Sequence, residues 1–141
     1  MDKEASLKLA TSLKFWYQYK PTKENFNESL VPIATFDTVE DFWALYQHFN
    51  RPSTLEDNTY LYLFQESIKP VWEDDANLNG GSFVLRFDKG KSDKVWEDML
   101  LAFLKLKTEK NEAINGIRSK IRKAMLVIEV WVRNGDNEKE L

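Results

Sequence analysis

The order of apolar and polar positions predicts short strands separated by polar turns, with two amphipathic helices among them. Strands are expected where aromatic and β-branched residues alternate with polar ones, or form short apolar runs bounded by turn residues. Six segments fit this description: residues 13–19, 33–36, 60–64, 82–87, 116–122 and 125–132. Most of them are joined by short polar connections, which favours antiparallel neighbours.

The first helix has a clear start signal. Either Asp37 with Glu40 or Thr38 with Asp41 forms a capping-box pattern ahead of an apolar run, and the helix should end near residue 50, ahead of Pro52. Its apolar positions fill one arc of the helix wheel, from Val39 through Phe42, Leu45, Tyr46 and Phe49, with Trp43 on the shoulder.

A second helix is predicted for residues 92–106, where apolar residues recur at helical spacing. The two ends, residues 1–11 and 134–141, are expected to form a frayed or helical lead-in and a flexible polar tail. The whole chain, 1–141, then forms a single α+β domain, whose helices cover one face of an antiparallel sheet and leave the other face open.

Composition supports one globular domain. The chain has 141 residues, of which 43% are hydrophobic and 30% charged, with only 5 Gly and 4 Pro, so collagen-like and wholly disordered classes are excluded. There is no cysteine, and the first residues lack the apolar core of a secretory signal. We therefore expect a cytoplasmic protein, with a nuclear pool also compatible with the composition.

Charge and aromatic content narrow the ligand class. The net charge is −3 and the sequence pI about 5.3, whereas proteins that wrap duplex nucleic acid usually carry a strongly basic surface. The 5 Trp, 5 Tyr and 9 Phe supply faces that can stack on a base, although aromatic residues more often belong to the core. If the chain binds nucleic acid, we expect it to bind only a small piece of the nucleic-acid molecule.

Signatures of catalysis are nearly absent. The single histidine, His48, falls on the polar side of the first helix and is best interpreted as a solvated side chain. Glu73, Asp74 and Asp75 could attract a cation, but consecutive acids rarely converge on one ion and no second acidic cluster completes a site. The pair Gly80-Gly81 indicates a turn rather than a phosphate-binding loop.

An aromatic residue in a polar loop gives the strongest functional signal. Trp72 stands beside Glu73, and it either folds back on the core or serves as a stacking surface. A carboxylate next to such a surface can accept both the ring N–H and the amino hydrogens of guanine, a bidentate match that adenine does not offer. Phe26, in the polar connection 22–30, could close the stack from the other side.

Two long motifs resemble a known family. Residues 69–81, with the sequence KPVWEDDANLNGG, and residues 35–46, with the sequence TFDTVEDFWALY, are similar to the cap-binding eukaryotic translation initiation factor 4E family. The motif Phe15-Trp16-Tyr17, Trp96, and the spacing of Arg122 and Trp131 match in the same order. The resemblance covers about residues 13–132, with features of the 4E homologous protein subclass in the sequence Asp74–Asn77 and in Phe26.

The resemblance implies a curved antiparallel sheet with amphipathic helices packed on its convex face and a 7-methylguanine slot at the concave mouth. Phe26 and Trp72 would sandwich the methylated base, and Glu73 would pair with its N1 and N2 hydrogens. Trp131 would touch the N7-methyl group. N7-methylation makes the ring cationic, so that stacking gains a cation–π contribution of about 0.5–2 kcal/mol per face. No catalysis, cofactor or metal is implied.

The sequence departs from the family pattern at one of the phosphate-side positions and at its C-terminal end. Arg122 would meet the triphosphate, and neighbouring Lys123 is a plausible helper rather than a matched position. Val127 stands where the family has a phosphate-side lysine. The sequence ends at Leu141, whereas the family continues through a third helix and further strands, so the C-terminal part of the family fold is expected to be missing.

The resemblance also implies a docking surface on the convex face. Val39, Trp43, Asp98, Leu101 and Leu104 match positions that receive scaffold or repressor proteins carrying a Tyr-x-x-x-x-Leu-apolar helix. Trp43 taken alone is equally compatible with the edge of the core. The family's His-Pro-Leu lead-in is replaced by residues 7–9, Leu-Lys-Leu, at one border of this surface.

Three functions follow, and the sequence leaves them open. The leading one is a non-enzymatic protein that binds the 7-methylguanosine 5′ cap of mRNA, either in initiation or as a repressor that occupies the cap. The second is a degenerate family member that acts only as a protein-interaction module through Trp43. The third is a cap-processing hydrolase that uses Mg²⁺ bound by Glu73, Asp74 and Asp75.

Overall fold

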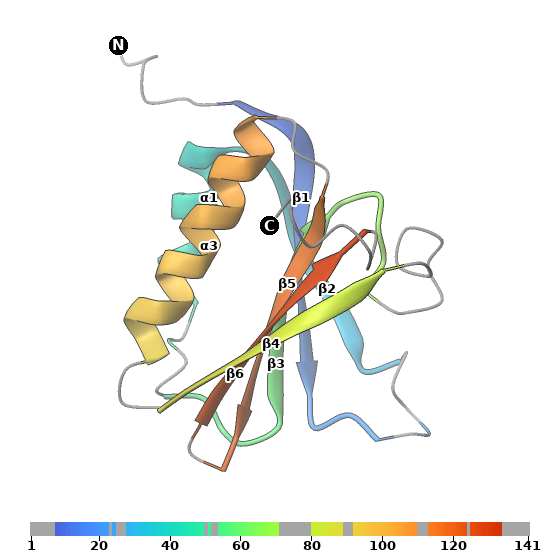
Figure 1. Cartoon of the computed structure of the whole chain (residues 1–141), viewed down its shortest axis with the longest axis vertical. Helices are drawn as coiled ribbons and strands as arrows, with labels where there is room; N and C mark the ends of the chain where they lie inside the picture. The colour runs from blue at the N-terminus through green and yellow to red at the C-terminus, as the bar shows by residue number, and fades with distance from the viewer. Residues whose placement is uncertain are drawn as a thin grey trace.

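The described residues form an open sheet of six strands with two helices on one face (Figure 1). The computed structural model describes residues 8–22, 24, 28–49, 51, 54–70, 80–88, 92–109, 113–123 and 125–133. The strands are β1 (Lys8–Tyr19), β2 (Leu30–Thr38), β3 (Thr59–Gln65), β4 (Gly81–Asp88), β5 (Ile114–Arg122) and β6 (Met125–Val132). Their order in the sheet is β2-β1-β3-β5-β6-β4, and all neighbours pair antiparallel.

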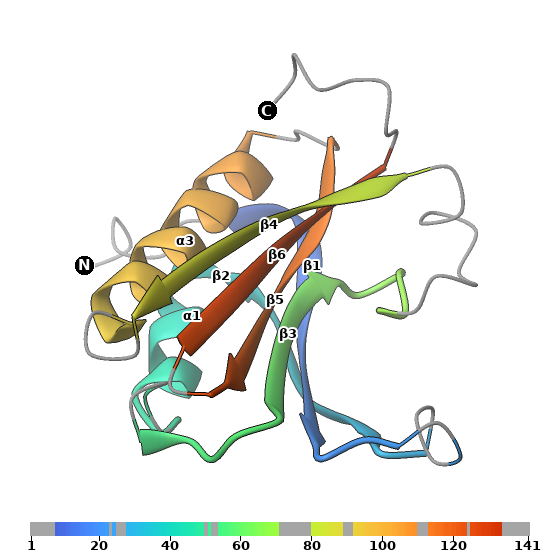
Figure 2. The same cartoon turned by 60° about the horizontal axis from the view of Figure 1, so that its bottom comes forward.

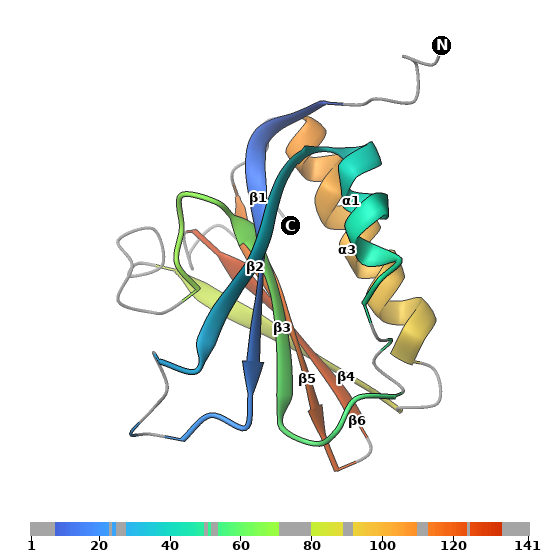
Figure 3. The same cartoon turned by 180° about the vertical axis from the view of Figure 1, so that it is seen from behind.

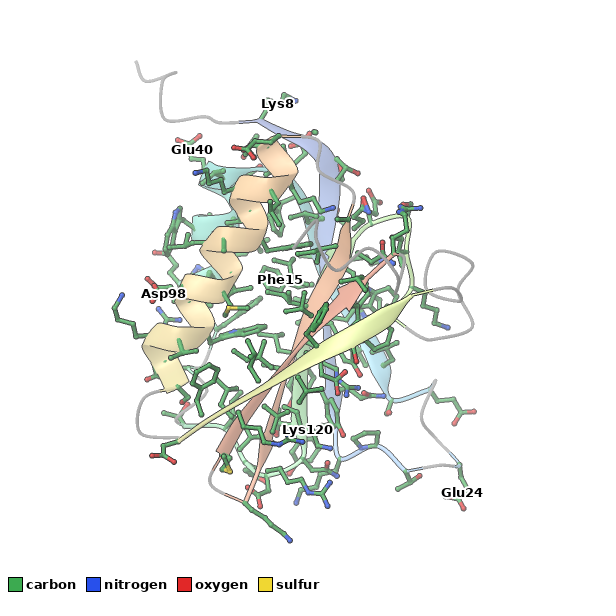
Figure 4. All side chains as sticks on the ribbon, in the orientation of Figure 1. Lys8, Phe15, Glu24, Glu40, Asp98 and Lys120 are labelled. Carbon is green, nitrogen blue, oxygen red and sulfur yellow. The ribbon has the colours of Figure 1, made fainter. Side chains whose placement is uncertain are left out.

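The sheet separates two apolar clusters. Successive side chains of a strand point to opposite faces, so one face packs on the helices and the other remains uncovered by any described element (Figure 2). We call these the helix face and the open face. The core on the helix face includes Leu13, Phe15 and Leu63, and Figure 4 shows Phe15 between the sheet and the helices. Every residue of the central strand β3 is buried.

Helices α1 (Val39–Tyr46) and α3 (Ser92–Thr108) lie side by side on the helix face (Figure 3). Thr38 is the N-cap of α1, and its hydroxyl accepts a hydrogen bond from the Asp41 backbone N–H at 3.0 Å. Thr38 with Asp41 is thus the capping pair that forms. Neither described helix is long and apolar enough to cross a membrane.

The predicted α+β class, the antiparallel sheet and the placement of both helices on one face are confirmed. The prediction that residues 1–11 form a frayed or helical lead-in is wrong for residues 8–11, because β1 begins at Lys8. The reason is long-range pairing: β2 extends to Thr38, which lies opposite Lys8, and Leu9 is buried in the core. Helix α1 is also shorter than expected, ending at Tyr46 before a turn.

Candidate functional site

The open face carries a floor of aromatic side chains from three strands, β1, β3 and β6. The aromatic members of the buried cluster on this face are Trp16, Tyr60, Tyr62, Phe64 and Trp131. Antiparallel register brings them together, because residues directly opposite share a face. We call this set the aromatic floor.

Trp131 is held firmly at one end of the aromatic floor. It is 2% exposed, and its ring meets Phe64 edge-on, with centroids 5.1 Å apart and planes at 83°. Its indole Nε1 donates to the Glu129 Oε1 at 3.0 Å. The ring therefore has one fixed orientation, set by an aromatic contact and a hydrogen bond.

Gly116 makes room for this packing. It lies opposite both Phe64 and Trp131, and a Cβ at this position would come within 2.3 Å of the Phe64 ring. Real Cβ atoms do not approach so closely, and the ring is confined by Trp131 on its other side. Glycine is required here for space, not for backbone conformation.

We therefore expect Gly116→Ala to lower the free energy of unfolding by about 1–3 kcal/mol, the usual cost of overpacking a core. Urea unfolding followed by circular dichroism measures the change. An unchanged midpoint would mean that Phe64 and Trp131 are not packed as described.

A partly buried ion pair lies next to Trp131. The Arg118 guanidinium donates through Nη2 to the Glu129 Oε2, and the two side chains are 16% and 18% exposed. The Arg118 guanidinium carbon also lies 5.0, 5.8 and 5.9 Å from the ring centroids of Tyr60, Tyr62 and Trp131. Burial acts to lower the pKa of Arg118, but Glu129 and Tyr62 together raise it above its ordinary value, so the guanidinium is charged.

Tyr62, a member of the aromatic floor, is held in place by its hydroxyl group. Burial raises the pKa of its hydroxyl to about 12, so that it stays protonated at neutral pH. The hydroxyl donates to the Gln18 Oε1 at 2.6 Å, and the Gln18 Nε2 donates in turn to the Ser29 Oγ at 3.2 Å. This chain of bonds ties β3 to the start of β2.

Cationic side chains follow β5 along the same face. Arg118, Lys120 and Arg122 alternate with buried apolar or small residues, so all three point to the open face. Lys120 is half-buried, with its Nζ 5.2 Å from the Tyr60 ring centroid (Lys120 is labelled in Figure 4). Arg122 is exposed at the far end of the strand.

Arg122 and Trp131 thus mark the two ends of the open face. Trp131 lies opposite Gly116, and the six steps from residue 116 to residue 122 span about 20 Å at the usual strand rise. Lys123 is exposed in the following turn, with φ of 52°, and its backbone N–H donates to the Asp57 Oδ2 at 3.2 Å.

Phe26, Trp72 and Glu73 lie outside the described residues, so their geometry stays a prediction. The flanks of residues 71–79 are described: the Gly80 Cα packs against the Val132 carbonyl, and Ile68 belongs to the cluster that contains Trp131. Both described flanks of residues 71–79 therefore lie at the end of the sheet where Trp131 lies.

The predicted docking residues lie on the two helices. Trp43 and Leu101 are 40% and 36% exposed. Val39 is half-buried, and Asp98 is exposed, pairs with Lys94 at 3.2 Å and points away from the sheet (Figure 4). Leu104 is buried in the core, so it supports this surface from beneath and does not line it.

Comparison with known proteins identifies the family. The model of the eukaryotic initiation factor 4E family matches residues 8–141. The chain belongs to this family.

Curated 4E-family relatives include plant proteins of about one-third identity. The translation initiation factor NCBP of Triticum aestivum is 34% identical over 93% of this chain, and the initiation factor 4E-1 of Arabidopsis thaliana is 37% identical over 92%. The chain spans only 58% and 57% of the lengths of these two relatives.

Solved 4E structures share the fold closely. Ascaris suum eIF4E-3 in complex with an m7G cap superposes with a TM-score of 0.86 at 32% identity, covering 96% of this chain and 78% of the other. Caenorhabditis elegans eIF4E-3 in complex with the 4E-binding protein Mextli and a cap analogue gives 0.87 at 29% identity, covering 96% and 79%.

Sequence reasoning did not single out Arg118, Glu129 or Gly116. The alternation of Arg118, Lys120 and Arg122 was a usable signal, because three cations at every second position of a strand share one face. The contact between Arg118 and Glu129 depends on the register of β5 with β6, in which these two residues are directly opposite. That register follows from the tertiary structure.

Proposed function

We propose that this 4E-family chain binds the 7-methylguanosine 5′ cap of mRNA, in translation initiation or its regulation, and performs no chemical step on it. The observation that supports this most is the open face itself, where a fixed tryptophan at one end is followed by a line of cations leading to the other. Relatives of the same fold have been solved in complex with m7G and m2,2,7G caps. We further propose a cytoplasmic location.

The base would bind at the Trp131 end. The described flanks of the segment with Trp72 and Glu73 lie there, and Phe26 would supply the second stacking face. Stacking between two aromatic faces favours the cationic, methylated base by about 0.5–2 kcal/mol per face. Glu73 would accept the N1 and N2 hydrogens of guanine in a charge-assisted pair, and Trp131 would contact the N7-methyl group.

The triphosphate would run along β5 towards Arg122, with Lys123 just beyond. A path from Trp131 to Arg122 passes over Arg118 and Lys120. The charge of Arg118 is compensated by Glu129, whereas Lys120 forms no ion pair with an acid within the described part of the chain. Lys120 and Arg122 are therefore the cations that we expect to bind phosphate, which offsets the absence of a lysine at Val127.

We expect Phe26→Trp to tighten binding of a cap analogue by about two- to tenfold, or about 0.5–1.4 kcal/mol, because indole is the stronger cation–π partner. Fluorescence titration with 7-methylguanosine triphosphate measures the dissociation constant. Equal or weaker affinity in a folded variant would remove Phe26 from the stack.

Retention on a 7-methylguanosine-triphosphate resin tests the proposed function itself. The chain should bind, elute with free 7-methylguanosine triphosphate, and resist the same concentration of GTP. Elution by both nucleotides alike would indicate a nonspecific phosphate site.

A second function concerns protein partners. Trp43 on α1 and Leu101 on α3 are exposed on the helices, away from the aromatic floor, and a half-exposed tryptophan is typical of an interface hot spot. We propose that scaffold or repressor proteins dock a Tyr-x-x-x-x-Leu-apolar helix here. The solved complex of eIF4E-3 with Mextli supports a binding-protein partner. A chain that bound such a peptide but no cap would be an interaction module only.

A further inference from the structure

Glu129 connects two side chains of the open face. One carboxylate oxygen, Oε1, accepts from the Trp131 indole at 3.0 Å, and the other, Oε2, accepts from the Arg118 guanidinium. We propose that Arg118 is a positioning residue which acts through Glu129 to fix the Trp131 ring, and thereby sets the selectivity for N7-methylated over unmethylated guanine. This inference rests on the proposed cap-binding function.

The hydrogen bond to Glu129 decides how the Trp131 indole is turned. An indole has a single N–H donor, and residues two apart on a strand share a face, so Glu129 is its nearest acceptor along β6. Phe64 meets the ring edge-to-face, and the ring is 2% exposed, so its N–H needs an acceptor within the protein. Removing the Glu129 acceptor would deprive the buried indole N–H of this hydrogen bond, which is costly. The ring could then turn about its χ angles.

Arg118 is what allows a carboxylate to stand in this place. The Glu129 side chain is only 18% exposed. Without a neighbouring cation, a carboxylate so far removed from water would be destabilised or would turn to solvent. The guanidinium lies directly opposite on β5 and bonds to the oxygen that Trp131 does not use. Three ring faces, of Tyr60, Tyr62 and Trp131, hold it there.

The consequence for binding is specific to the methyl group. Trp131 would contact only the N7-methyl edge of the base, whereas Glu73 and the phosphate-binding cations contact groups that guanine possesses with or without methylation. A turned Trp131 should therefore weaken binding of the methylated nucleotide and leave GTP binding nearly unchanged. Loss of a phosphate contact would weaken both nucleotides together.

Two neutral double variants test this. The R118M/E129Q variant replaces the ion pair but keeps an amide oxygen as acceptor for the indole, while the R118M/E129L variant removes the acceptor as well. Both avoid an uncompensated buried charge, so both should fold. The K120M variant is the matched control, since Lys120 lies on the same face of β5 and over Tyr60 but does not contact Glu129 or Trp131.

The readouts are dissociation constants for 7-methylguanosine triphosphate and GTP, together with the Trp131 indole N–H signal in ligand-free ¹H–¹⁵N spectra, assigned with a W131F variant. We expect R118M/E129L to lose about tenfold in affinity for the methylated nucleotide only, with a shifted and faster-exchanging indole signal. R118M/E129Q should keep the affinity for the methylated nucleotide and the indole signal near those of the wild type. The R118M single variant should fall between the two double variants. K120M should weaken both nucleotides equally and leave the indole signal in place.

Three results would overturn the inference. One is selectivity for the methylated nucleotide equal to that of the wild type, with an unchanged indole signal, in R118M/E129L. Another is loss of selectivity in R118M/E129Q to the same extent as in R118M/E129L, which would make Arg118 itself a contact or a packing element. The third is an R118M variant that weakens both nucleotides in the same proportion as K120M. Failure of the wild type to bind either nucleotide would instead contradict the proposed function, while the indole signal would still report on the positioning of Trp131.

Discussion

Trp72→Ala and Glu73→Ala should each abolish retention on a 7-methylguanosine-triphosphate resin while leaving the domain folded. Truncating Trp72 removes one stacking face, worth about 1–3 kcal/mol per base, and the cation–π share with it. Truncating Glu73 leaves guanine donors desolvated and unpaired, at a cost of about 1–3 kcal/mol or more. Both residues belong to the segment 71–79, whose described flanks lie beside Trp131.

Asp75→Ala is the matched control, because it removes an acid from the same loop without touching the base. It should be retained like the wild type, with or without Mg²⁺. A cap-processing hydrolase would instead lose Mg²⁺-dependent turnover of a cap analogue in both Asp74→Ala and Asp75→Ala. Specific elution of either Trp72→Ala or Glu73→Ala by the cap analogue at wild-type salt would contradict the slot assignment.

Trp43→Ala should eliminate binding of a Tyr-x-x-x-x-Leu-apolar peptide and leave binding of 7-methylguanosine triphosphate nearly unchanged. Trp43 is 40% exposed, so its truncation should cost little stability and at least about 2 kcal/mol of binding, as is usual for a hot-spot tryptophan. Its ring touches Phe42 and Tyr46 edge-on from the outside, with centroids 5.1 and 6.1 Å apart.

Phe42→Ala provides the contrast, since Phe42 is fully buried one position earlier on α1. It should lose about 3–5 kcal/mol of stability through the cavity that it creates. Calorimetry with the peptide and thermal melting of both variants separate the two effects. A melting temperature that falls as far in Trp43→Ala as in Phe42→Ala would make Trp43 part of the core, and unchanged peptide binding would remove the docking surface.

Much of the fold follows from local sequence pattern. The apolar run that forms β6 and the capping pair Thr38 with Asp41 depend on near neighbours, and the structure contains both. The prediction for the lead-in is wrong because the structure of these residues depends on a distant segment. The sequence of Lys8–Leu13 does not show where the strand begins, and its start is set by the pairing of Lys8 with Thr38.

The candidate site divides in the same way. Trp131 and Arg122 could be found from the spacing of a family motif, and the structure places them at opposite ends of one face. The pair of Arg118 with Glu129 could not, since two charged residues 11 positions apart become neighbours only through strand register. The burial of Leu104 likewise depends on how α3 packs on the sheet, which helical periodicity alone does not decide at the edge of an apolar arc.

The most direct test of the central claim is a titration of the wild-type chain with 7-methylguanosine triphosphate and with GTP at one fixed salt concentration, by isothermal calorimetry. Because both nucleotides carry the same phosphates, their affinity ratio isolates recognition of the methylated base. We predict at least about tenfold tighter binding of the methylated nucleotide, from cation–π stacking on two faces and the contact with Trp131. Equal affinities, or no binding of either nucleotide by the folded chain, would contradict it.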